Sequence, residues 1–249
     1  MTSLRWRPAK LGFALALVPL LTVGATAQIL VSANDNKAVL VNGANVVPAN
    51  PAADTVSIID LGVSPPKLIG EVKAPASVIG PPQSVAISRD ETFALVTGAF
   101  KVDPADPNKA IPDNKLSVID LKAKPPAVIA TLEAGLGAAG VSINNAGTLA
   151  LVANRSEGTV SVFTVSGNKL TPAGKIQLGD SKSGPSHVAF TPDGKSALVT
   201  RDGDNRVSIL TVDGNKVEDS KAFMGERASR SMRSCDFRTQ VPENARHND

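Results

Sequence analysis

"VAFTPDGKSALV" (residues 188–199) sets one alternating apolar run before a Pro-Asp-Gly turn and a second run after it. Such alternation is typical of strands with one buried face, and Pro-Asp-Gly is typical of a tight turn. The stretch therefore predicts a β-hairpin. The same twelve-residue pattern occurs three more times without gaps, as "LVSANDNKAVLV" (30–41), "VAISRDETFALV" (85–96) and "VSINNAGTLALV" (141–152).

Two further apolar segments follow each copy of the hairpin. The third segments are "TVSIIDL" (55–61), "LSVIDL" (116–121), "TVSVFTV" (159–165) and "RVSILTV" (206–212). The fourth segments are "KLIGEV" (67–72), "AVIATL" (127–132), "AGKIQL" (173–178) and "EDSKAFM" (218–224). The valines that close the hairpins, Val41, Val96, Val152 and Val199, are 55, 56 and 47 residues apart. Four short strands per unit at this spacing are typical of a β-propeller blade.

A lone four-stranded meander cannot bury both of its apolar faces, so the units must stack around a common axis. The sequence thus predicts an all-β propeller of about four four-stranded blades, at about 28–75, 82–134, 138–180 and 185–224. "PSHVAFTPDGKSALVT" (185–200) and "LALVANRSEGTVSVF" (149–163) resemble the WD40-like repeats of YVTN-family and lactonase-like bacterial β-propellers. That resemblance implies seven blades, whereas only four units are present. We therefore expect an open or incomplete ring rather than a closed four-bladed one, with exposed blade faces through which copies can self-associate.

The two ends of the chain do not fit the repeat. Residues 1–27 combine three basic residues, the apolar run "LGFALALVPLLTV" (11–23) and "ATA" (25–27), which predicts a signal peptide and a mature start at Gln28. An uncleaved N-terminal anchor is the alternative. Export places the protein in the periplasm or outside the cell. Residues 225–249 contain no copy of the repeat, and both a disordered tail and a shifted reading frame after about Met224 account for them.

Composition excludes several functions. The formal charge of +3 comes from Arg5, Arg7 and Lys10, and the mature chain balances 23 basic against 23 acidic residues. We therefore expect no nucleic-acid partner, and no stable membrane span after cleavage. With Cys235 as the only cysteine, no intramolecular disulfide can form. No zinc-ligand spacing is present, and "AFTPDGKS" (189–196) sits in a hairpin rather than before a helix, so we expect no metal and no cofactor.

In a propeller, residues before the first strand and after the second strand of each blade share one rim. That rim collects two candidate catalytic residues, His187 and Arg201, and four candidate ligand-binding residues, Asn154, Arg155, Asp202 and Asp204. The resemblance to lactonase-like propellers implies a general-base role for His187 and oxyanion stabilisation by Arg201. However, Ile29, Ser84 and Gly140 occupy the positions equivalent to His187, so no ring of catalytic groups recurs. A structural cap is the other interpretation of His187.

The same rim carries two long insertions, 43–55 and 99–115, which are either recognition loops or tolerated surface loops. Asp103, Asp106 and Asp113 in the second insertion are either calcium ligands or solvated acids. The sequence is therefore compatible with three functions. The first is a binding or scaffold module that recognises a protein or small ligand through rim loops. The alternatives are a lactone hydrolase and an inactive remnant of a longer propeller.

Overall fold

The computed structural model describes residues 28–48, 50–77 and 84–224. The predicted signal peptide (1–27) and the non-repeat tail (225–249) lie outside these residues. Throughout the described ranges the regular structure consists of strands, so the predicted all-β class is confirmed. No helix long and apolar enough to cross a membrane occurs within those ranges.

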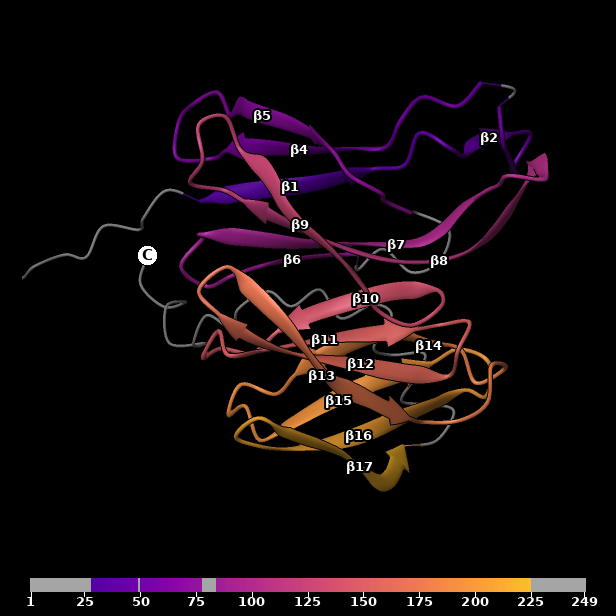
Figure 1. Ribbon diagram of the computed structural model, residues 1–249, viewed down its shortest axis with the longest axis vertical. Helices are drawn as coiled ribbons and strands as arrows, with labels where there is room; N and C mark the ends of the chain where they lie inside the picture. Colours follow the sequence, from indigo (N-terminus) through magenta and orange to yellow (C-terminus); the bar gives the residue numbers. More distant parts are fainter. Residues whose placement is uncertain (1–27, 49, 78–83, 225–249) are drawn as a thin grey trace, which may run out of the picture.

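The strands form one antiparallel sheet per blade (Figure 1). The first sheet contains β1 (Ile29–Asn34), β4 (Thr55–Asp60) and β5 (Lys67–Lys73), with a separate hairpin of β2 (Val39–Val41) and β3 (Ala44–Val46). The second contains β6 (Val85–Ile87), β7 (Phe93–Asp103), β8 (Asp106–Asp120) and β9 (Ala127–Glu133). The third contains β10 (Ala138–Ile143), β11 (Leu149–Asn154), β12 (Thr159–Ser166) and β13 (Lys169–Gln177). The fourth contains β14 (Pro185–Phe190), β15 (Ser196–Arg201), β16 (Arg206–Asp213) and β17 (Lys216–Met224).

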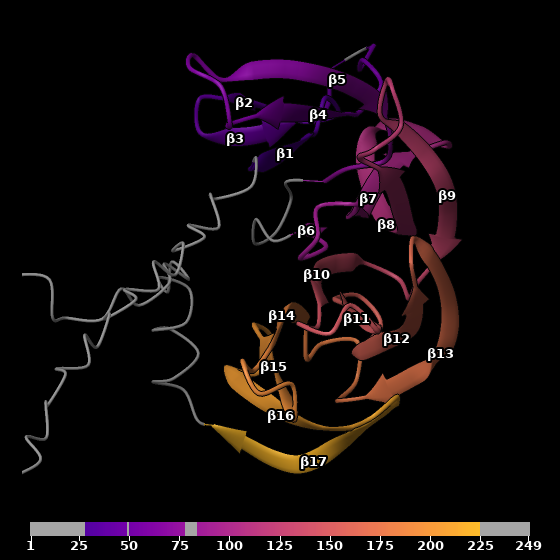
Figure 2. The same ribbon diagram turned by 90° about the vertical axis from the view of Figure 1, so that its left-hand side faces the viewer.

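The four sheets stand side by side in an arc rather than a closed ring, as predicted (Figure 2). In the second to fourth blades, β6, β10 and β14 are the innermost strands, and β9, β13 and β17 lie on the convex side. The tight turns use glycine where the backbone needs positive φ, for example Gly194 (φ 68°) in the Pro-Asp-Gly turn and Gly214 (φ 57°) in the last hairpin.

The core is a series of apolar layers between neighbouring blades. Alternate side chains of each strand point to opposite faces, so every inner blade contributes to two layers. Phe163 on β12, 1% exposed, packs with Leu116 and Val118 of the second blade. Similar layers join the first blade to the second and the third blade to the fourth. Gly140 allows β10 to approach β14, because a Cβ there would lie 2.5 Å from Ser186 O and 2.8 Å from His187 Cα.

The predicted first hairpin, 30–41, is wrong. β1 pairs with the third segment of its unit, β4, and not with residues 39–41. A serine in the third segment shows the register, because Ser117, Ser161 and Ser208 lie opposite Val96, Val152 and Val199. In the first blade Ser57 lies opposite Ser32. β1 is therefore equivalent to the second strands β7, β11 and β15, and within the described residues the first blade has no inner strand.

With this register, Ile29 is not equivalent to His187, whereas Ser84 and Gly140 are, as predicted.

The two predicted insertions are also not loops. Residues 99–115 extend β7 and β8 into a long hairpin, and residues 44–46 pair with 39–41. Asp103 and Asp106 lie opposite each other near the tip of the long hairpin, while Asp113 is buried and forms an ion pair of 3.7 Å with Lys101. Within the described residues no group of three metal-ligating side chains gathers.

The layer between the second and third blades gives a direct test of this packing. Phe163→Ala removes a fully buried ring and leaves a cavity, so we expect the free energy of unfolding to fall by about 3–5 kcal/mol. Urea denaturation followed by circular dichroism measures this change. Phe223→Ala is the matched control because Phe223 is 54% exposed, with Arg206 above its ring, and we expect this change to cost less than about 1 kcal/mol. Equal losses in both variants would contradict the proposed packing.

Candidate functional site

The predicted rim is built from a polar clasp at the end of each second strand. In the third blade, Asn154 is fully buried and all of its side-chain groups are used. Its Nδ2 donates to Thr159 Oγ1 (2.8 Å) and Ser161 Oγ (2.9 Å), and its Oδ1 accepts the backbone N–H of Gly135 (2.9 Å). Gly135 lies in the connector from β9 to β10. The clasp therefore ties the second and third strands of one blade to the chain that enters it.

The other blades vary the clasp at the equivalent position. In the fourth blade, Arg201 replaces the asparagine, and its Nη1 donates to Ser208 Oγ (3.3 Å) while its Nη2 pairs with Asp204. In the second blade the position is Gly98, and within the described residues Ser117 Oγ is buried with no hydrogen-bond partner. A Cβ on Gly98 would lie 3.1 Å from Pro75 Cβ, so the connector fills this space.

Arg155 and Asp202 join the third and fourth blades. Their Nη1 and Oδ2 atoms lie 2.7 Å apart, and both side chains are partly exposed. Each follows the second strand of its own blade, so the same turn position supplies a cation in one blade and an anion in the next. This pair links the turns of two blades, and each charge has a partner of opposite sign.

His187 lies at the start of β14, half-buried, with Thr200 opposite. Thr200 Oγ1 is 3.3 Å from His187 Nδ1 and accepts the backbone N–H of His187 at 3.0 Å. Arg201 is the next residue along β15, but this residue is only 8% exposed and its guanidinium is engaged by Asp204 and Ser208. The structure thus brings the six predicted residues to one rim, where Asn154, Arg155, Arg201, Asp202 and Asp204 bond one another or the scaffold.

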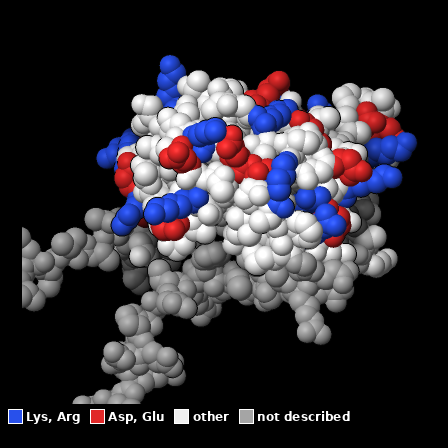
Figure 3. Space-filling view, turned by 90° about the horizontal axis from the view of Figure 1, so that it is seen from below, with Lys and Arg blue, Asp and Glu red and all other residues white. Residues whose placement is uncertain are grey.

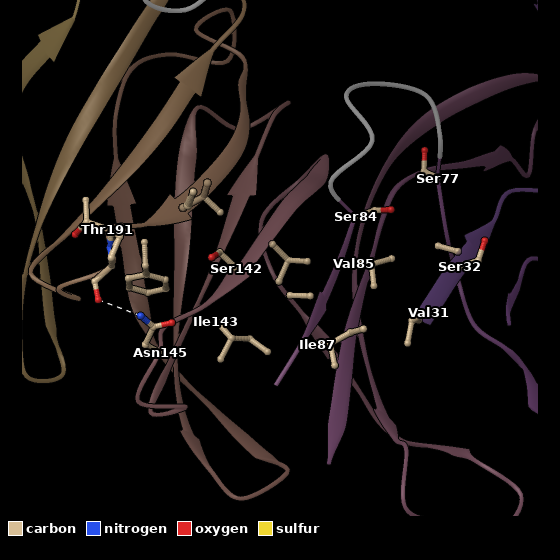
Figure 4. A pocket seen from close by; sticks show the side chains of 17 residues that line it. Val31, Ser32, Ser77, Ser84, Val85, Ile87, Ser142, Ile143, Asn145 and Thr191 are labelled. Atoms are coloured by element: carbon tan, nitrogen blue, oxygen red, sulfur yellow. Dashed lines mark hydrogen bonds between the residues drawn. The ribbon is translucent and has the colours of Figure 1, made fainter. Parts of the chain in front are cut away.

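A recess lies on the concave face of the arc (Figure 4). It is a groove of about 860 Å³ lined by β1, β6, β10 and β14. Its walls carry apolar side chains such as Val85, Ile143 and Phe190, with Ser84 at the rim end and Asn145 at the other. Asn145 Nδ2 donates to Pro192 O (3.0 Å) and joins the third and fourth blades there. The six predicted site residues do not line this groove.

Charge does not mark a site on the face seen in Figure 3. Acidic and basic side chains are interspersed there, and no extended field of one sign appears among the described residues. Glu157 is a rim carboxylate with specific contacts. Its Oε1 accepts Lys175 Nζ (2.8 Å) and its Oε2 accepts the backbone N–H of Leu136 (2.8 Å). Burial disfavours its charge, but these two hydrogen bonds outweigh burial and hold the pKa of Glu157 below its ordinary value of 4.5.

Comparison with known proteins agrees with this geometry. Residues 114–222 match the sequence model of the family described as "Lactonase, 7-bladed beta-propeller". This part of the protein is similar in sequence to lactonase-like β-propellers. The match begins in β8 and ends in β17, so it covers the clasps of the third and fourth blades and includes His187.

Solved structures are similar to the propeller in fold. A functionally unknown protein from Desulfotomaculum acetoxidans DSM 771 is 23% identical with a TM-score of 0.54, over 73% of this chain and 52% of that one. Hydrazine synthase from Kuenenia stuttgartiensis is 21% identical with a TM-score of 0.48, over 72% of this chain and 43% of that one. A putative 6-phosphogluconolactonase from Bacteroides fragilis NCTC 9343 is 18% identical with a TM-score of 0.42, over 75% of this chain and 69% of that one. The propeller thus spans about half of the length of the first two structures. No curated protein matches it.

Sequence reasoning missed Glu157, Asn34 and the groove. The signal for Asn34 was present, because "SAN" (32–34) precedes "TVS" (55–57) as "VAN" (152–154) precedes "TVS" (159–161). The longer insertion in the first unit concealed that equivalence. The groove carried no local signal, since its walls come from four strands that are far apart in the chain.

The depressed pKa of Glu157 gives a pH test. A carboxylate with a lowered folded-state pKa stabilises the fold above pH 4.5 and loses that contribution as the pH falls through the folded value. Glu157→Gln keeps an acceptor for Leu136 but removes the charge. We expect the melting temperature of the variant to lie about 2–4 °C below that of the wild type at pH 7, with the gap closing toward pH 3. Differential scanning calorimetry measures it, and a gap independent of pH would refute the assignment.

Proposed function

We propose that this propeller is a binding or scaffold module that works in the periplasm or outside the cell. It engages a protein or small ligand at the rim and in the groove that opens beside Ser84. One observation carries this proposal. The polar rim residues are committed to bonds that hold blades and connectors in place, whereas the groove is a recess of about 860 Å³ lined by both apolar and polar side chains. A concave site that combines apolar walls with polar groups is typical of ligand binding.

An environment-sensitive dye, anilinonaphthalene sulfonate, tests whether the groove binds ligands. We expect saturable fluorescence enhancement with the wild type, and its loss in Phe190→Asp, because Phe190 lines the groove. Phe223→Asp is the matched control, since that ring lies exposed on the last strand and outside the groove. Circular dichroism verifies that both variants keep the strand content of the wild type. Equal dye binding by Phe190→Asp and the wild type would refute the groove as the site.

A lactone hydrolase is the second candidate, because the family match includes His187 and that side chain stands half-exposed at the rim. Its Nδ1 lies beside the Thr200 hydroxyl, which orients the imidazole. A base in this position would need a reacting group within hydrogen-bond reach.

Turnover of a panel of five- and six-membered lactones, monitored by pH-stat titration, decides between the two functions. For a binding module we expect rates at the level of the buffer, with His187→Ala indistinguishable from the wild type. Turnover by the wild type that falls by a factor of about 100 or more in His187→Ala would establish the hydrolase instead.

A further inference from the structure

The first blade differs from the other three at its inner edge. In the second to fourth blades an inner strand pairs with the second strand, as β10 does with β11. In the first blade β1 occupies the second-strand position, and within the described residues it pairs with β4 alone. The register with β4 leaves the backbone groups of Val31 and Ala33 on the inner edge, where Leu151 and Ala153 of β11 face β10. An uncovered strand edge is a template for a further strand.

The cap at the start of β1 shows the same difference. In the other blades, the residue after the inner strand caps the first N–H of the second strand with its side chain. Asn144 Oδ1 accepts Leu149 N–H (3.0 Å), Ser88 Oγ accepts Phe93 N–H (3.1 Å) and Thr191 Oγ1 accepts Ser196 N–H (3.1 Å). In the first blade Glu91, from a turn of the second blade, reaches across to Ile29 N–H (3.1 Å). A side chain from a neighbouring blade thus substitutes for the cap.

The clasp of the first blade is also built for an incoming connector. Asn34 donates to Thr55 Oγ1 (3.1 Å) and Ser57 Oγ (2.9 Å), which repeats the bonds of Asn154 to Thr159 and Ser161. In the third blade the amide oxygen then accepts Gly135 N–H from the connector. In the first blade the same oxygen accepts the hydroxyl of Ser32, its neighbour on β1 (3.1 Å). The asparagine is oriented for a connector that the described residues do not supply.

An apolar surface lies beside this edge. Leu30 is 39% exposed and Leu68 is 57% exposed, and both flank Ile59 on the face of the first blade that points away from the second. The equivalent face of the third blade, with Ala150 and Phe163, is buried against its neighbour. The edge of β1 and the apolar face beside it thus match one side of the interfaces between the other blades. Within the described residues, the other side of this interface is not present.

We propose that, in a mature chain that begins at Gln28, the first blade is an acceptor for a strand donated by another polypeptide. The occupant is an extended segment with a glycine-containing connector followed by alternating apolar residues, like residues 134–143 of this chain. Its strand pairs with β1 along Val31 and Ala33, and its connector amide donates to Asn34 Oδ1. This inference rests on the proposed function, because Val31 and Ala33 also line the groove. It names an extended peptide strand as one class of ligand.

A synthetic peptide of residues 133–145 (EAGLGAAGVSINN), labelled with a fluorophore, is the probe, and fluorescence anisotropy measures its binding to the full chain. We expect saturable binding that a scrambled peptide does not show. Val31→Pro should abolish it, because proline removes an N–H on the inner edge and leaves the β4 bonds intact. Asn34→Ala should weaken it about 3–10-fold by loss of one hydrogen bond. Asn215→Ala, at an exposed position of the turn between β16 and β17, should leave it within about twofold.

Hydrogen exchange gives a second readout that does not depend on a variant folding. With the peptide bound, the amides of Val31 and Ala33 should gain protection. No saturable binding, or binding unchanged by both Val31→Pro and Asn34→Ala, overturns the proposal. So does a dimer, detected by sedimentation, in which the amides of Val31 and Ala33 are protected without peptide and which the peptide does not dissociate. If the peptide fails while the dye still binds the groove, strand capture alone is wrong; if the dye also fails, the proposed function falls with it.

Discussion

Apolar packing between neighbouring blades is the interaction on which the rest of this structure depends. Each sheet has apolar side chains on both faces, so no blade can bury its residues without a neighbour. Val152 and Leu151 on adjacent positions of β11 show this, since one packs toward the second blade and the other toward the fourth. Stability therefore comes mainly from the apolar layers between sheets. Among the described residues, each of the two end blades takes part in one such layer, whereas each inner blade takes part in two.

The polar rim follows from the same requirement. Blades that pack through flat apolar layers can slide or splay, and directional bonds at their edges prevent this. Asn154 holds a connector, Arg155 and Asp202 join two blades, and Arg201 is held beneath its own connector by Asp204 and Ser208. The arginine, asparagine and acidic residues of the rim are thus held by bonds that support the scaffold. The same residue types would be expected in a hydrolytic site, and only their partners distinguish the two roles.

The sequence was sufficient where local pattern and packing agree. Alternation and turns such as Pro-Asp-Gly predicted about four four-stranded blades, and the second to fourth blades have the predicted four strands. Prediction failed in the first unit, where "LVSANDNKAVLV" has the alternation of a hairpin but β1 pairs across a longer insertion with β4. Two strands that fit the same pattern cannot be told apart by periodicity. The pairing of Ser57 with Ser32 shows the register of β1 and β4. This pairing joins residues that are far apart in the chain, so the sequence pattern alone does not show it.

The incomplete first blade connects these points. Its inner edge, its asparagine and its apolar face are each the counterpart of something occupied elsewhere in the same chain. A defect of folding would leave these features unrelated, whereas here the register of β1, the donors of Asn34 and the exposure of Leu30 agree on one missing element. Glu91, which has positive φ (53°), satisfies the one edge N–H that an added strand would leave unpaired, as the equivalent N–H is capped by a side chain in every other blade. The edge is therefore prepared for a partner, and its remaining backbone groups determine that the partner must be a strand.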